Sequence, residues 1–129
     1  MKEKFSFNSP WEDIVGYSRA IRVGNVIELS GTVAVNESGH VVGPGDAYEQ
    51  TKYIIAKIIN YVEKAGGRKE DIVRTRMFVT DISRWEEIGR AHGEYFKDIK
   101  PVTTMVEVKS LISKDYLVEI EATAMIHDI

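Results

Sequence analysis

Residues 117–126 constrain the fold most strongly, because apolar and polar side chains alternate along the whole segment. One set of alternate positions is apolar throughout and consists of Val118, Ile120, Ala122, Ala124 and Ile126. The other set consists of Leu117, Glu119, Glu121, Thr123 and Met125. Successive side chains of a strand point to opposite faces of the sheet. The segment therefore predicts a β-strand whose apolar face lies beneath helices.

Four further segments read as extended: residues 18–23, 26–33, 72–80 and 103–108. Gly24-Asn25 joins the first two and suits a two-residue hairpin turn. Apolar residues at helical spacing after Asp46, an expected N-cap, predict a helix that ends at Gly66-Gly67.

A second helix is expected to open with a capping box formed by Ser83 and Glu86. Its buried stripe should contain Trp85, Ile88, His92, Tyr95 and Phe96. The resulting order ββαβαββ predicts a single α+β domain over residues 1–129. In such a domain, both helices cover one face of a mixed sheet.

Composition excludes several classes of function. The chain has no cysteine, which excludes disulfides, zinc–thiolate sites and a thiol nucleophile. No histidine has a partner at metal-ligand spacing, so we expect neither a metal nor a cofactor. A net charge of −3 gives no reason to expect nucleic acid as a partner. The longest apolar stretch, residues 53–62, is interrupted by Lys57 and Asn60 and is too short to span a bilayer. Residues 1–10 lack the apolar core of a secretory signal, and we expect a cytoplasmic protein.

The sheet face directed away from the helices mixes apolar and charged side chains. We expect Phe78, Met105, Leu117 and Met125 to lie there beside arginines and glutamates. A face of this composition is better explained by contact with another subunit than by contact with water. A closed ring of identical subunits would cover it.

An ordered series of short motifs resembles the RidA/YjgF family of reactive-intermediate deaminases, which also includes the endoribonuclease L-PSP type. The motifs are Tyr17-Ser18-Arg19-Ala20, Val23-Gly24-Asn25, Ser30-Gly31, Glu63-Lys64-Ala65-Gly66-Gly67, Asp71-Ile72-Val73, Phe78-Val79, Pro101, Val106-Glu107-Val108 and Val118-Glu119-Ile120-Glu121-Ala122. The resemblance implies a chorismate-mutase-like fold and a barrel-like homotrimer with ligand clefts between neighbouring subunits. It also implies hydrolysis of 2-imino and 2-enamino acids to 2-keto acids and ammonia.

The sequence departs from this family where the substrate carboxylate would be held. Active family deaminases carry an arginine two residues after the proline of this strand, and here Thr103 follows Pro101 at that distance. A guanidinium clamps a carboxylate with two charged hydrogen bonds, whereas a hydroxyl offers one neutral bond. Gly89 occupies a position that is often asparagine in the family. We therefore expect weak or absent hydrolysis of the 2-imino acids formed from small neutral amino acids.

Three residues match family positions that line the cleft: Tyr17, Gly31 and Glu119. By resemblance, Glu119 positions the catalytic water; alternatively, it neutralises arginines on the same sheet face. Arg19 or Arg76 could replace the missing arginine as the anchor for an anionic ligand. The alternative is that Arg76 only pairs with glutamates across strands.

Three functions remain open at this stage. The chain could be a RidA-type enzyme that acts on a small imine or enamine. It could be a trimer that binds a small, anionic metabolite without turnover. It could also be an RNA-directed translation inhibitor or endoribonuclease, which would need a basic groove with stacking aromatics that the spacing does not provide.

Overall fold

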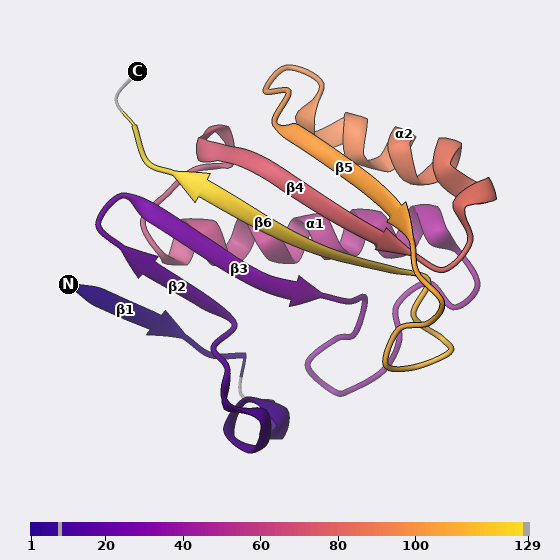
Figure 1. Ribbon diagram of the computed structural model, residues 1–129, viewed down its shortest axis with the longest axis horizontal. Helices are drawn as coiled ribbons and strands as arrows, with labels where there is room; N and C mark the ends of the chain where they lie inside the picture. Colours follow the sequence, from indigo (N-terminus) through magenta and orange to yellow (C-terminus); the bar gives the residue numbers. More distant parts are fainter. Residues whose placement is uncertain (8, 128–129) are drawn as a thin grey trace.

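The computed structural model describes residues 1–7 and 9–127. Within these ranges the chain forms one six-stranded sheet and two long helices (Figure 1). The strands are β1 (Lys2–Phe5), β2 (Ala20–Val23), β3 (Val26–Thr32), β4 (Ile72–Val79), β5 (Val102–Glu107) and β6 (Val118–Met125). The helices are α1 (Ala47–Lys64) and α2 (Trp85–Phe96), with short helical turns η1 (Glu12–Gly16), η2 (Lys69–Asp71) and η3 (Ile82–Arg84).

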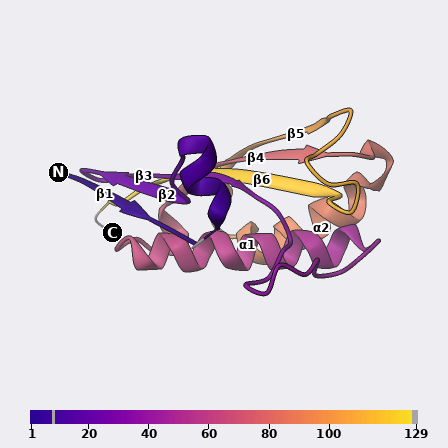
Figure 2. The same cartoon turned by 90° about the horizontal axis from the view of Figure 1, so that it is seen from below.

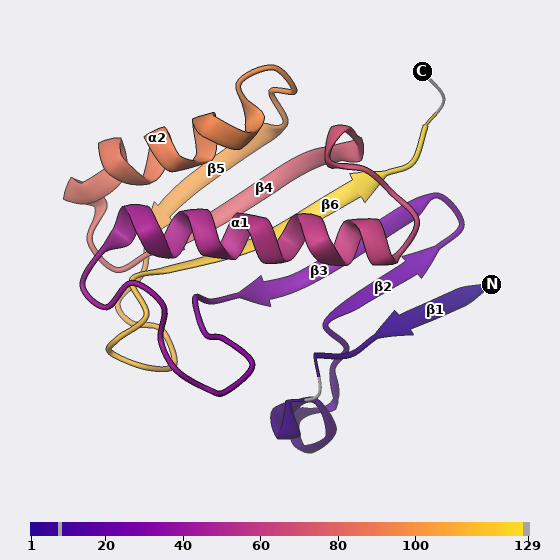
Figure 3. The same cartoon turned by 180° about the vertical axis from the view of Figure 1, so that it is seen from behind.

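The sheet is mixed, as predicted, and its strands follow the order β1-β2-β3-β6-β4-β5. β4 and β5 pair in parallel, and the other neighbours pair antiparallel. Both helices pack on one face (Figure 2), while η1 lies beyond the ends of β1 and β2 (Figure 1). From behind, α1 crosses the middle of the sheet and α2 lies beside it over β4 and β5 (Figure 3). The predicted α+β class, with both helices on one face, is confirmed.

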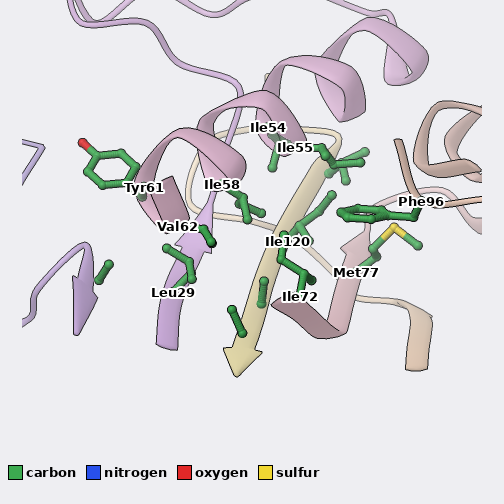
Figure 4. Packing of buried hydrophobic residues seen from close by; sticks show 14 of the residues in the cluster. Leu29, Ile54, Ile55, Ile58, Tyr61, Val62, Ile72, Met77, Phe96 and Ile120 are labelled. Carbon is green, nitrogen blue, oxygen red and sulfur yellow. The ribbon is translucent and has the colours of Figure 1, made fainter. Parts of the chain in front are cut away.

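The main core lies between α1 and the centre of the sheet. Ile54, Ile55 and Ile58 are fully buried and point from α1 towards β6, where Ile120 lies (Figure 4). The predicted apolar face of residues 118–126 is confirmed from Val118 to Ala124, which are buried at every second position. Burying one such aliphatic side chain contributes about 1.5–3 kcal/mol to stability, so this layer dominates the fold.

The two helices begin differently. The Asp46 side chain accepts a 3.0 Å hydrogen bond from the Glu49 N–H, which confirms the predicted N-cap of α1. The predicted capping box at Ser83 is wrong, because Asp81 accepts hydrogen bonds from both the N–H and the hydroxyl of Ser83. These bonds form the turn η3, and α2 starts after it at Trp85. Trp85 is consequently 56% exposed and does not belong to the buried stripe, whereas Ile88 does.

Two strand details differ from the sequence prediction. β1 was not predicted; it pairs with β2 at the edge of the sheet. β3 contains a register shift between Leu29 and Thr32, where it pairs with β6. A β-bulge of this kind reverses the side-chain alternation beyond it. Thr32 is therefore buried on the helix side, although simple alternation placed it on the opposite face.

The outer face of the sheet is partly apolar, as predicted, with two corrections. Phe78 is half-buried there and Met125 is 47% exposed, whereas Leu117, which precedes β6, packs against the core. Met105 lies on the helix side, because its parallel neighbour is the buried Met77 and it packs against the core. The prediction that Met105 lies on the outer face is therefore wrong. No helix in the described ranges is long and apolar enough to cross a membrane.

Candidate functional site

The bulge in β3 places Gly31 directly against the side chain of Glu119 on β6. A Cβ atom at Gly31 would lie 2.5 Å from the Glu119 Oε2 atom and 3.0 Å from its Cδ atom. Contacts this short do not occur between non-bonded atoms, so a larger residue at position 31 would displace the carboxyl group. Glycine at this position therefore makes room for the carboxyl group of Glu119.

Arg19 joins this group from the segment that leads into β2. Its Nη2 atom donates a 2.7 Å hydrogen bond to the carbonyl oxygen of Gly31. Its Nε atom is buried and has no hydrogen-bond partner among the described residues. The guanidinium lies 5.6 Å from the centre of the Tyr17 ring, within the range of a cation–π contact. A buried N–H without a partner is costly, so the single chain leaves this guanidinium incompletely satisfied.

The Glu119 carboxyl group has a perturbed acidity. Burial raises its pKa above the usual 4.5, Arg19 opposes this shift, and the neighbouring Glu121 adds to it. A carboxyl group with a raised pKa exchanges protons more readily near neutral pH than an exposed one. The arrangement places a carboxyl group of raised pKa beside a cation.

Tyr17 is held by the segment around η1. The Glu12 carboxylate accepts hydrogen bonds from the N–H groups of Phe7 (3.0 Å) and Ser9 (3.3 Å), and its carbonyl oxygen accepts from the Tyr17 N–H (3.0 Å). Tyr17 and Ser30 line a broad hollow of about 1030 Å³ between η1 and the first three strands. Four predicted site residues thus lie in one region, which we call the Glu119 cluster: Tyr17, Arg19, Gly31 and Glu119.

Arg76 lies on the same sheet face but has a different partner. Its Nη1 atom is 3.3 Å from the Glu121 Oε1 atom, and both side chains are more than one-third exposed. This geometry matches the alternative in which Arg76 neutralises a carboxylate across strands. Of the two candidate anchors, Arg19 is the one that adjoins Glu119.

Thr103 lies apart from the Glu119 cluster. Its hydroxyl is 2.9 Å from that of its strand neighbour Thr75, which is buried on the helix side of the sheet. The Thr75 hydroxyl is also 2.9 Å from the Nε2 atom of His92 on α2. Glu119 faces the other side of the sheet, so one chain cannot bring Thr103 and Glu119 to the same small ligand.

The sequence predictions did not include the bond between Thr75 and His92. His92 was expected to pack in the core; it is half-buried, and its ring centre lies 4.7 Å from that of Phe96. Burial lowers the pKa of His92, which keeps the ring neutral at neutral pH. The available signal was that Thr75 and His92 both belong to inward-facing stripes. Among the described residues, no group of three acidic or histidine side chains could hold a metal ion.

Comparison with known proteins places the chain in a family. Residues 8–126 match the family model described as endoribonuclease L-PSP. A RutC family protein of Pyrococcus abyssi is 38% identical, over 84% of this chain and 84% of that protein. A protein of Streptomyces coelicolor is 34% identical, over 90% of this chain and 86% of that protein.

Solved structures agree with the sequence matches. A YjgF family member from Mycobacterium tuberculosis is 41% identical with a TM-score of 0.89, covering 98% of this chain and 100% of that one. A Rid family protein from Yersinia pestis is 32% identical with a TM-score of 0.85 and the same coverage. The resemblance found in the sequence motifs is therefore confirmed, and the chain belongs to the RidA/YjgF family, whose matching model is described as endoribonuclease L-PSP.

Proposed function

We propose that this protein binds a small anionic imine or enamine and hydrolyses it, with Arg19 holding the anion and Glu119 transferring the proton. The observation that carries the proposal is the Glu119 cluster. It places an arginine with one free buried N–H beside a carboxyl group of raised pKa, over a glycine that leaves room for it. Family membership supports the reaction class, because the sequence motifs resemble those of imine-hydrolysing deaminases.

The chemistry needs only water and one acid–base group. A water molecule adds to the imine carbon while the Glu119 carboxylate accepts a proton from it. The same carboxyl group then returns that proton to nitrogen, which gives a carbinolamine. The carboxylate next takes the proton of the new hydroxyl group and passes it to nitrogen as the C–N bond breaks, so that a carbonyl product and ammonia leave. Arg19 holds an acidic group of the substrate so that the imine carbon faces Glu119.

We further propose that the active form is a homotrimer with the ligand cleft between neighbouring copies. The outer sheet face supports this, because Phe78 and Met125 occur there together with the exposed Val102 and Val106 of β5. A half-apolar face of this extent is typical of a subunit contact. The separation of Thr103 from the Glu119 cluster also supports it, since the two regions could contribute to one cleft only from different copies.

The test is an imine-trapping competition. An amino acid oxidase generates 2-imino acids from alanine or leucine, semicarbazide traps them, and the protein is expected to lower the trapped fraction. We expect a weak effect with the alanine product, because Thr103 replaces the family arginine. Glu119→Gln should abolish the effect, and Arg19→Gln should reduce it about ten- to a hundredfold, the value of a charge-assisted hydrogen bond.

Arg76→Gln is the matched control, since Arg76 lies on the same sheet face but pairs with Glu121. Equal losses in the Arg19 and Arg76 variants would contradict the assignment of the anchor. Full activity in Glu119→Gln would refute the proposed proton transfer. Saturable binding of 2-keto acids without any turnover would favour the non-catalytic alternative.

A further inference from the structure

A second cavity lies on the helix side of the sheet, between α2 and β5. It has a volume of about 450 Å³, within the usual range of roughly 300–1,000 Å³ for small-molecule sites. Met77, Phe96 and Met105 supply apolar walls, and Thr103 supplies a hydroxyl group. Neither the Glu119 cluster nor the hollow beside η1 shares any of these residues. We call this space the α2–β5 cavity.

Two glycines on α2, Gly89 and Gly93, keep the α2–β5 cavity open. A glycine inside a helix destabilises it by about 1 kcal/mol relative to alanine. The backbone does not require either one: neither has a positive φ, and a Cβ atom at either position would meet nothing within 4 Å. Larger side chains at these positions would project into the cavity that both glycines line. Larger residues at these two positions would therefore leave the fold intact but would fill the cavity.

The polar groups in the wall form a chain of hydrogen bonds that uses the only proton of Thr103. The Thr103 hydroxyl lies 3.1 Å from the carbonyl oxygen of Pro101 and 2.9 Å from the Thr75 hydroxyl, so it can donate to either. If it donates to Pro101, Thr75 can donate to Thr103 and the His92 Nε2 atom, 2.9 Å from Thr75, can donate to Thr75. If it donates to Thr75, Thr75 can donate to His92.

Both arrangements leave Thr103 with the same group to offer a ligand. Its only proton is already donated, so the hydroxyl oxygen presents a remaining lone pair. An arginine at this position would present several charged donors. A lone pair repels a carboxylate and accepts a hydrogen bond from a hydroxyl, amide or amine group.

The cations near the cavity lie at its mouth. Lys97 and Lys100 are exposed, and the Lys100 Nζ atom donates to the Lys97 carbonyl oxygen (2.6 Å). Charges on exposed lysines are solvated and screened by salt. The C-terminal end of α2, which also borders the cavity, carries a partial negative charge. The interior therefore offers no strong anchor for an anion.

We propose that the α2–β5 cavity binds an uncharged, largely apolar ligand group that carries a hydrogen-bond donor, and that Thr103 selects it by accepting that hydrogen bond. This group would be the part of a substrate that does not react. In that respect the inference rests on the proposed function, in which the Glu119 cluster of a neighbouring copy holds the anion. Binding to the cavity itself requires neither turnover nor Glu119.

The test uses three probes of similar size: benzyl alcohol, toluene and benzoate. Methionine methyl groups are labelled with ¹³C and followed by NMR during titration of the assembled protein. Met77 and Met105 report on the cavity, while Met1 and Met125 lie outside it and serve as internal controls. We expect benzyl alcohol to shift the signals of Met77 and Met105. It should bind at least about tenfold more tightly than benzoate, because its hydroxyl group donates a hydrogen bond to Thr103, whereas the carboxylate of benzoate is repelled by the Thr103 lone pair.

Variants separate the walls from the hydroxyl. Thr103→Val keeps the shape and should reduce the affinity for benzyl alcohol to that for toluene. Thr103→Arg should reverse the preference in favour of benzoate. Gly93→Leu should fill the cavity and prevent binding of all three probes while leaving the fold intact, because the space around its Cβ is empty.

Several results would overturn the proposal: tighter binding of benzoate to the unchanged protein, equal shifts at Met125, or no shift at Met77 and Met105 with any probe. The last would mean that another copy of the chain already fills the cavity. The probes carry no imine carbon, so the titration reports on binding to the cavity whether or not Glu119 transfers a proton. Failure of the hydrolase proposal would therefore appear in the trapping assay alone.

Discussion

Replacing Gly31 by alanine should disturb Glu119 more than the fold. The new Cβ atom would lie 2.5 Å from the Glu119 Oε2 atom, whereas ordinary contacts begin at 3.4 Å. The carboxyl group must therefore withdraw by about 0.9 Å, and a misplacement of about 1 Å at a catalytic group can cost about a hundredfold in rate. The destabilisation should stay near 1 kcal/mol, the low end for overpacking, because the clash is with the end of a flexible side chain.

The assay pairs urea unfolding with the imine-trapping competition. Gly89→Ala is the matched control for the unfolding measurement alone, because its Cβ has open space but lines the α2–β5 cavity, and it should raise stability by about 1 kcal/mol. In the Gly31→Ala background, Glu119→Asp removes one methylene group and should restore most of the lost stability but not the activity. Such coupling is expected only between residues in contact. Normal stability and activity in Gly31→Ala, or no coupling with Glu119→Asp, would refute the described contact.

Three further predictions concern charge and assembly. Glu119→Gln should stabilise the protein by about 0.5–2 kcal/mol at pH 7, as substitutions at functional sites often do. Burial raises the pKa of Glu119, so ionisation of this carboxyl group destabilises the folded state as pH rises above 4.5. Below pH 4.5 the carboxyl group is protonated in both states, and the stability gained by Glu119→Gln should vanish there. Urea unfolding at several pH values measures this difference. Arg76→Ala should cost at most about 1 kcal/mol in urea unfolding, because its pair with Glu121 is more than one-third exposed; a loss of about 3–5 kcal/mol would mean that assembly buries the pair. Light scattering should give a mass near three times 14.6 kDa, and a stable monomer at micromolar concentration would contradict the trimer.

The sequence predicted elements whose signals are local. The alternation of residues 118–126 and the Asp46 cap depend only on neighbours along the chain, and both appear in the structure. The strand β1 has no such signal, because its residues are charged or exposed and it forms only by pairing with β2. The start of α2 was misplaced because Asp81 competes with Ser83 for the capping position.

The site was predictable as a set of residues but not as an arrangement. Gly31 inside a predicted strand was a signal for a bulge, yet simple alternation continued through it and placed Thr32 on the wrong face. The orientation of Thr103 could not be decided from β5 alone, because both faces of that strand mix polar and apolar residues. Only its pairing with β4 places Thr103 beside Thr75.

The position of the cation changes how binding depends on assembly. An arginine at position 103 would lie across the sheet from Glu119 of the same chain, so such an anchor and Glu119 could meet one ligand only in a trimer. Arg19, in contrast, hydrogen-bonds to the carbonyl oxygen of Gly31, the residue that contacts Glu119 in the same chain. Under the proposed function, one copy would therefore fix both anion binding and proton transfer, while selection of the apolar group would depend on the α2–β5 cavity of another. A dissociated chain should keep weak affinity for small anions and lose its discrimination between ligands of different size.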